Sequence, residues 1–127
     1  MTKYKSQSFS NTFKNARKGM RLSLKSEKNI RIHFFSALLV LTTAFYFNFS
    51  TVKICILILA ISSVISAEML NSAIEFALDS VYHNRYSKMV GMAKDIAAGA
   101  VMVVSFGAVI IGILLFAPVF YRLIFGT

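Results

Sequence analysis

The sequence lacks tryptophan and has one cysteine, one proline and five acidic residues in 127. With Cys55 alone, a single chain can form neither a disulfide nor a cysteine-based metal site. It has no GxxxxGK[ST] loop and no glycine-rich strand–helix turn, so nucleotide-binding folds of the soluble type are excluded. No GxSxG motif or Cys/His arrangement supports acyl transfer. His33 and His83 are far apart in the sequence and are interpreted as residues of a membrane interface rather than as metal ligands.

The composition is that of an integral membrane protein. Hydrophobic residues make up 57% of the chain and include 12 phenylalanines. The net charge of +9 lies in segments that flank apolar runs, which indicates contact with anionic lipid rather than with nucleic acid. The length predicts one domain, residues 1–127. We expect no cleavable signal peptide, because the basic segment ahead of the first long apolar run is too long.

The pattern predicts an all-α membrane protein with one surface helix and three membrane helices. The surface helix is expected over residues 9–27, with apolar residues at helical spacing at Phe9, Phe13, Ala16, Met20 and Leu24. Basic residues fall on another face, as in an amphipathic helix at the cytoplasmic interface, although a solvated basic arm is an alternative. The membrane helices are expected over residues 30–49, 52–80 and 93–121. More Lys and Arg precede residue 32 than lie elsewhere, which predicts a cytoplasmic N-terminus and an external C-terminus.

Three of the five acidic residues share one stripe in residues 68–79, EMLNSAIEFALD. At about 100° per residue, Glu75 and Asp79 each lie within about 20° of Glu68 around a helix axis. If the helix starts near residue 52, Glu68 lies roughly 22 Å into a hydrocarbon core ~30 Å thick. A carboxylate near lipid costs roughly 2.5–3.5 kcal/mol at mid-helix. The stripe therefore calls for a cation, a binding cleft or both.

The other two acidic residues lie beside basic neighbours. Glu27 would face the apolar side of the surface helix, where it is either a ligand or an ion-pair partner of Lys28 or Arg31. Asp95 follows Lys94 at the start of the third membrane helix.

These residue types suit phosphoryl transfer. Mg²⁺ binds one or two carboxylates and completes its shell with water and phosphate oxygens. A lysine neutralises phosphate charge, and a buried carboxylate takes a hydroxyl proton. From spacing alone, a proton relay or ion pathway fits about as well. A channel, however, would need polar residues through the whole bilayer, and residues 54–65 offer little beyond Ser62 and Ser63.

Four motifs resemble the prokaryotic diacylglycerol kinase family, whose members are small integral membrane lipid kinases unrelated to P-loop or protein kinases. They are ExxNSAIExxxD at residues 68–79, AKDxxAGAV at 93–101, KGM at 18–20 and SEKNIRIH at 26–33. The form ExNxRIH is similar to the undecaprenol kinase branch of Gram-positive bacteria. The resemblance implies ATP- and Mg²⁺-dependent phosphorylation of undecaprenol in a bacterial plasma membrane. Diacylglycerol kinase activity is one alternative, and a non-catalytic membrane scaffold or cation pathway is another.

The resemblance also implies a homotrimer with composite sites, and a role for each matching residue. Glu68 would be the general base on the lipid hydroxyl, and Glu27 and Glu75 would hold the cation that bridges the ATP phosphates. The remaining assignments are Asn71, Lys94 and Asp95 for ATP, Arg31 and Ala98 for the lipid, and Asp79 and Ser72 as supports. Asn71 would orient the base or the phosphate, Lys94 would neutralise phosphate charge, and Asp95 would place Lys94 or contact the nucleotide. The diacylglycerol branch has Ser where Ala98 stands, and the loop over residues 80–93 differs, which leaves contacts from Asn84, Arg85 and Tyr86 open.

Overall fold

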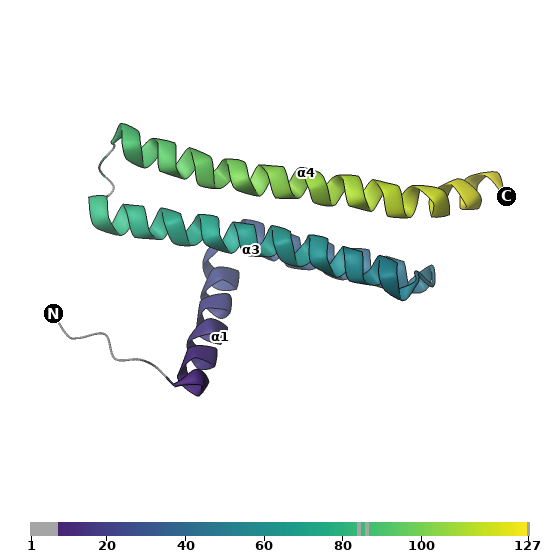
Figure 1. Cartoon of the computed structure of the whole chain (residues 1–127), viewed down its shortest axis with the longest axis horizontal. Coiled ribbons are helices and arrows are strands. Elements are labelled where there is room, and N and C mark those ends of the chain that lie inside the picture. Colours follow the sequence, from purple (N-terminus) through teal and green to yellow (C-terminus); the bar gives the residue numbers. More distant parts are fainter. Residues whose placement is uncertain (1–7, 84, 86, 127) are drawn as a thin grey trace.

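The computed structural model describes residues 8–83, 85 and 87–126, and this part of the chain is helical (Figure 1). The helices are α1 (Phe9–Ser26), α2 (Lys28–Tyr46), α3 (Thr51–Tyr82) and α4 (Lys88–Phe125). Helices α2, α3 and α4 are each long and apolar enough to cross a membrane. For the described residues, the prediction of an all-α protein with three candidate membrane helices is confirmed.

The structure extends the third predicted membrane helix at both ends. α4 begins at Lys88 rather than at 93, after Ser87 in extended conformation, and it continues past Pro118 to Phe125. Gly126 ends it in the left-handed conformation, with φ +67°, which glycine adopts at little cost. In an apolar environment the backbone groups can be satisfied only within the helix, which favours a long uninterrupted α4.

Helix α1 crosses the other three helices at a steep angle (Figure 1). Glu27 alone separates it from α2, and its extended backbone, with φ −106° and ψ 116°, makes the bend. Arg31 of α2 stabilises the bend, because its Nη1 donates to the carbonyl oxygens of Leu24 and Lys25 at 3.0 and 3.1 Å. These carbonyls belong to the last turn of α1, where a helix has no internal donors left.

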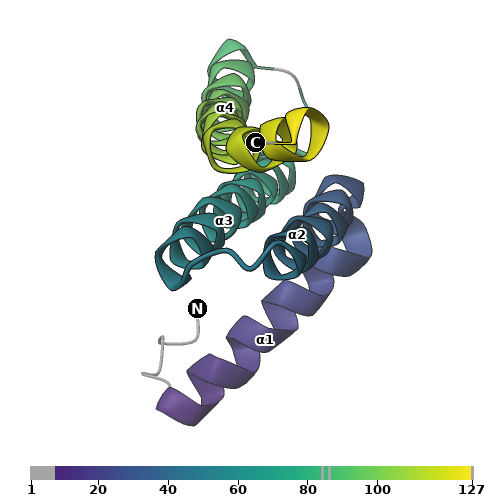
Figure 2. The same ribbon diagram turned by 90° about the vertical axis from the view of Figure 1, so that its right-hand side faces the viewer.

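Helix α3 lies between α2 and α4 (Figure 2) and packs against both. Its buried residues are Leu57, Val64, Glu68 and Ser72, which are four or seven positions apart and so share a face. Most large apolar side chains of α4 are exposed, such as Ile110 and Leu114. Such a surface suits lipid contact, since acyl chains rather than a protein core would cover it.

Phenylalanines hold the bundle together at the end where α2 turns into α3. The Phe49 and Phe116 ring centroids are 4.8 Å apart, and those of Phe47 and Phe120 are 6.2 Å apart. Lys53 Nζ lies 5.1 Å from the centre of the Phe49 ring. The turn itself passes through Asn48, which has φ 52°, a conformation that asparagine tolerates better than most residues. This end is therefore closed by aromatic packing between the turn and α4.

Candidate functional site

Glu68 is the most buried carboxylate of the described chain, with 8% of its surface exposed. It lies on the buried face of α3, one turn from Val64 and one turn from Ser72. His33 of α2 contacts it, with Nε2 and Oε1 3.3 Å apart. An ionised Glu68 can only accept in this contact, so the imidazole would donate from Nε2. The pair compensates a polar group that would otherwise be buried among apolar side chains.

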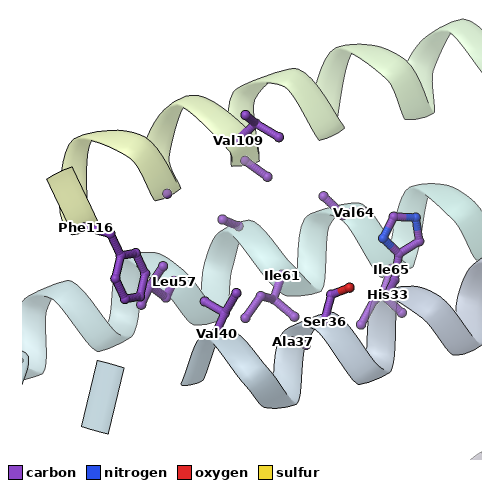
Figure 3. Close-up of a pocket in the computed structure, with 13 residues that line it drawn as sticks. His33, Ser36, Ala37, Val40, Leu57, Ile61, Val64, Ile65, Val109 and Phe116 are labelled. Carbon is purple, nitrogen blue, oxygen red and sulfur yellow. The ribbon is translucent and has the colours of Figure 1, made fainter. Parts of the chain in front are cut away.

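An apolar cavity of about 280 Å³ begins at the same histidine and runs between α2, α3 and α4. Figure 3 shows His33 at one end of it and Phe116 at the other. Its apolar lining includes Val40, Leu57, Ile61, Val64 and Val109, whereas His33 and Ser36 are the polar residues that contribute to it. The cavity thus offers an apolar space that ends in a polar side chain in contact with a buried carboxylate.

One turn further along α3, Asn71 and Glu75 form a second polar group. Asn71 Nδ2 donates to Glu75 Oε1 at 3.0 Å. Asn71 Oδ1 is buried and has no hydrogen-bond partner among the described residues. An unsatisfied buried acceptor costs about 1–3 kcal/mol, so this oxygen would gain from a partner that the described chain does not supply.

A third polar group joins α3 to α4. Lys94 Nζ donates to Asp79 Oδ1 at 2.6 Å, and about a third of each side chain is exposed, 33% for Lys94 and 40% for Asp79. Asp95, the adjacent carboxylate, is exposed. Lys94 thus contacts Asp79 of α3 rather than its neighbour Asp95. Asp79 lies on the same stripe of α3 as Glu68 and Glu75.

The remaining predicted site residues are spread along the chain, from the junction of α1 and α2 to α4. Glu27 is half-buried at the junction of α1 and α2, and its side chain makes no capping hydrogen bond. Arg31 caps α1, Ser72 is buried below Glu68 on α3, and Ala98 is exposed on α4. Within the described ranges, no three His, Cys, Asp or Glu residues gather into a metal-binding group. Asn84 and Tyr86 lie outside the described residues, and Arg85 is exposed.

The contact between His33 and Glu68 was missed by sequence reasoning, which placed His33 at the interface without a partner. A signal for it exists in the chain. α2 and α3 are joined by a short turn after Tyr46, so they run antiparallel, and His33 and Glu68 lie at similar distances along the chain from that turn. Two polar residues at similar depth in neighbouring membrane helices are expected to form a hydrogen bond with each other.

Comparison with known proteins identifies the same family that the sequence motifs resemble. Residues 14–116 match the family described as prokaryotic diacylglycerol kinase, and this range contains every predicted site residue. The chain is 34% identical over 110 residues to an undecaprenol kinase of Bacillus subtilis, covering 87% of this chain and 89% of that protein.

Two further relatives are named diacylglycerol kinase. A diacylglycerol kinase of Synechocystis is 33% identical over 107 residues, which cover 84% of this chain and 61% of that protein. The chain therefore spans less than two thirds of that relative's length. A diacylglycerol kinase of Haemophilus influenzae is 29% identical over 93 residues, covering 73% of this chain and 78% of that protein.

Proposed function

Because the chain belongs to the prokaryotic diacylglycerol kinase family, we propose that it is a lipid kinase that transfers the γ-phosphoryl group of ATP to undecaprenol. The observation that carries this proposal is the position of Glu68, a buried carboxylate reached from an apolar cavity through His33. A membrane alcohol that places the part of its tail next to the hydroxyl group in the cavity would present that hydroxyl at this polar end.

Glu68 is proposed as the general base. It accepts the hydroxyl proton while the lipid oxygen bonds to the γ-phosphorus, the bond from that phosphorus to the β–γ bridging oxygen breaks, and ADP leaves. Lys94 neutralises charge on the phosphates, and Asp79 holds the Lys94 ammonium in place. Asp95, exposed on the same turn of α4, is free to contact the nucleotide.

The residues around Glu75 fit a magnesium ion. The unpaired Asn71 Oδ1 lies beside the Glu75 carboxylate, and both offer the oxygen ligands that Mg²⁺ prefers. Glu75 and Glu27 would hold the ion, which would neutralise charge on the ATP phosphates. Asn71 would orient the base or a phosphate oxygen.

We also propose that the protein is a homotrimer in the bacterial plasma membrane, with its N-terminus and active site on the cytoplasmic side. The basic residues concentrated before residue 32 support this orientation. α1 would lie in the cytoplasmic interface, where exposed Phe9 and Phe13 reach the lipid. The trimer, with sites completed by a second protomer, is what the family resemblance implies.

Diacylglycerol is the second candidate acceptor. The Synechocystis and Haemophilus relatives that bear this name support it, since the Synechocystis protein is as similar to this chain as the Bacillus one. The ExNxRIH form at residues 27–33 favours undecaprenol.

The test is transfer of ³²P from labelled ATP into undecaprenol or diacylglycerol, each supplied separately with Mg²⁺ to the purified protein. We expect label in undecaprenol. Label mainly in diacylglycerol would keep the reaction and overturn the proposed acceptor. No label in either lipid, from a folded oligomer that binds ATP, would contradict the proposed function.

A further inference from the structure

His33 faces both Glu68 and the apolar cavity, although none of the roles assigned above requires a histidine there. Its Nε2 lies 3.3 Å from Glu68 Oε1, and its ring forms one end of the cavity lining (Figure 3). The His33 side chain is 30% exposed and that of Glu68 is 11% exposed, so the imidazole is the more accessible member of the pair.

The contact leaves half of the carboxylate available. Among the described residues, the hydrogen bond that Glu68 makes through its side chain goes from His33 to Oε1. Oε2 is then the oxygen that can accept a proton. A glutamate side chain has three rotatable bonds, and one charge-assisted hydrogen bond to a residue on another helix removes much of that freedom.

We propose that His33 is a positioning residue for the acceptor half of the reaction: its Nε2–H holds Glu68 Oε1 so that Oε2 points to the lipid hydroxyl at the end of the cavity. This inference rests on the proposed function, because it assumes that Glu68 is the base. It gives His33 no part in binding ATP, since the described contact of the His33 ring is with Glu68, whereas Lys94 contacts Asp79 and Asn71 contacts Glu75. Displacement of a reacting group by about 1 Å can cost on the order of 100-fold in rate.

The kinetic test compares three variants in lipid bilayers. His33→Leu removes the hydrogen bond and puts an apolar side chain in its place, and we expect kcat for lipid phosphorylation to fall about 30-fold with KM for ATP unchanged. His33→Gln keeps an N–H donor and should recover most of the loss, to within about fivefold of the unmutated protein. His83→Asn, at the exposed end of α3, is the matched control and should leave kcat unchanged.

A second arm asks whether His33 acts through Glu68. Glu68→Asp withdraws the carboxylate from the imidazole, so His33→Leu added to Glu68→Asp should lower the remaining activity by less than about twofold. A full 30-fold further loss would show that His33 acts elsewhere, and would overturn the proposal. Equal activities of His33→Leu and His33→Gln would overturn it as well.

Infrared spectroscopy separates failure of this inference from failure of the proposed function, because it needs no turnover. The carboxylate stretching band of Glu68 is the one absent from Glu68→Gln. We expect it to shift in His33→Leu and to stay close to its original position in His33→Gln. An unshifted band in His33→Leu contradicts positioning by His33. If the band shifts but the unmutated protein phosphorylates no lipid, the proposed function is contradicted instead. The contact between His33 and Glu68 would then have no role in catalysis.

Discussion

The two ends of the α2–α3–α4 bundle are held together by different interactions. At the turn between α2 and α3, four phenylalanines and one lysine meet, and ring packing closes the bundle. Towards the other end of α3, two polar contacts also link the helices, His33 to Glu68 and Lys94 to Asp79. The cavity connects the two regions, with Phe116 at one end and His33 at the other.

The difference indicates which end is built for stability and which for chemistry. Aromatic packing is compatible with lipid surroundings and costs no desolvation of charge. Carboxylates in a membrane helix are costly, and apolar residues in their place would join the helices at least as well. A chain that keeps an unpaired amide oxygen and three carboxylates on one stripe therefore has a use for them beyond stability. For this member of the prokaryotic diacylglycerol kinase family, we propose that this use is catalysis.

The largest effect is expected for Glu68→Gln. The substitution keeps the side chain's shape and removes the base, so lipid phosphorylation should fall by about 10³-fold, within the range for general base catalysis. Thermal unfolding in detergent and oligomer size should remain close to those of the unmutated protein. Full activity in this variant would contradict the assignment of Glu68.

Lys94→Met should have the next largest effect, with kcat/KM for ATP about 100-fold lower, because a cation that neutralises developing phosphate charge is lost. Asp79→Asn keeps the lysine but weakens the contact that positions it. We expect a smaller decrease in kcat/KM for ATP, about fivefold. Lys88→Met, at the exposed start of α4, is the control and should stay within twofold. Equal losses in Lys94→Met and Lys88→Met would indicate a general effect of charge.

Glu75→Gln and Glu27→Gln should each raise the Mg²⁺ concentration needed for half-maximal activity, by about tenfold, because each removes one carboxylate ligand. Saturating Mg²⁺ should restore part of the rate in both variants. An unchanged Mg²⁺ titration would argue against ligation by that residue.

The smallest effect on activity is expected at the aromatic end, where Phe47→Ala and Phe49→Ala should destabilise the protein and leave kcat within about threefold. Each loses a ring pair worth about 0.5–1.5 kcal/mol beyond its burial, so thermal unfolding should begin at lower temperature. Phe106→Ala, an exposed position on α4, is the control and should change the unfolding temperature less. A large loss of kcat at unchanged stability would contradict the conclusion that the aromatic end serves stability and the other end serves catalysis.

Much of the fold follows from the sequence. Long apolar runs produce helices wherever the backbone must satisfy its own hydrogen bonds, and α2, α3 and α4 lie where these runs do. The helical period places Glu68, Glu75 and Asp79 on one stripe, and the structure builds its polar groups along that stripe.

The partners on other helices were decided by the tertiary structure. His33 meets Glu68 across 35 positions, and Asp79 rather than Asp95 meets Lys94. These contacts depend on the rotation and tilt of α2 and α4 against α3, which come from packing over the whole length of each helix. The cavity has the same origin, because its lining comes from three helices. Periodicity along one helix defines its faces, but which faces meet is a property of the packed bundle.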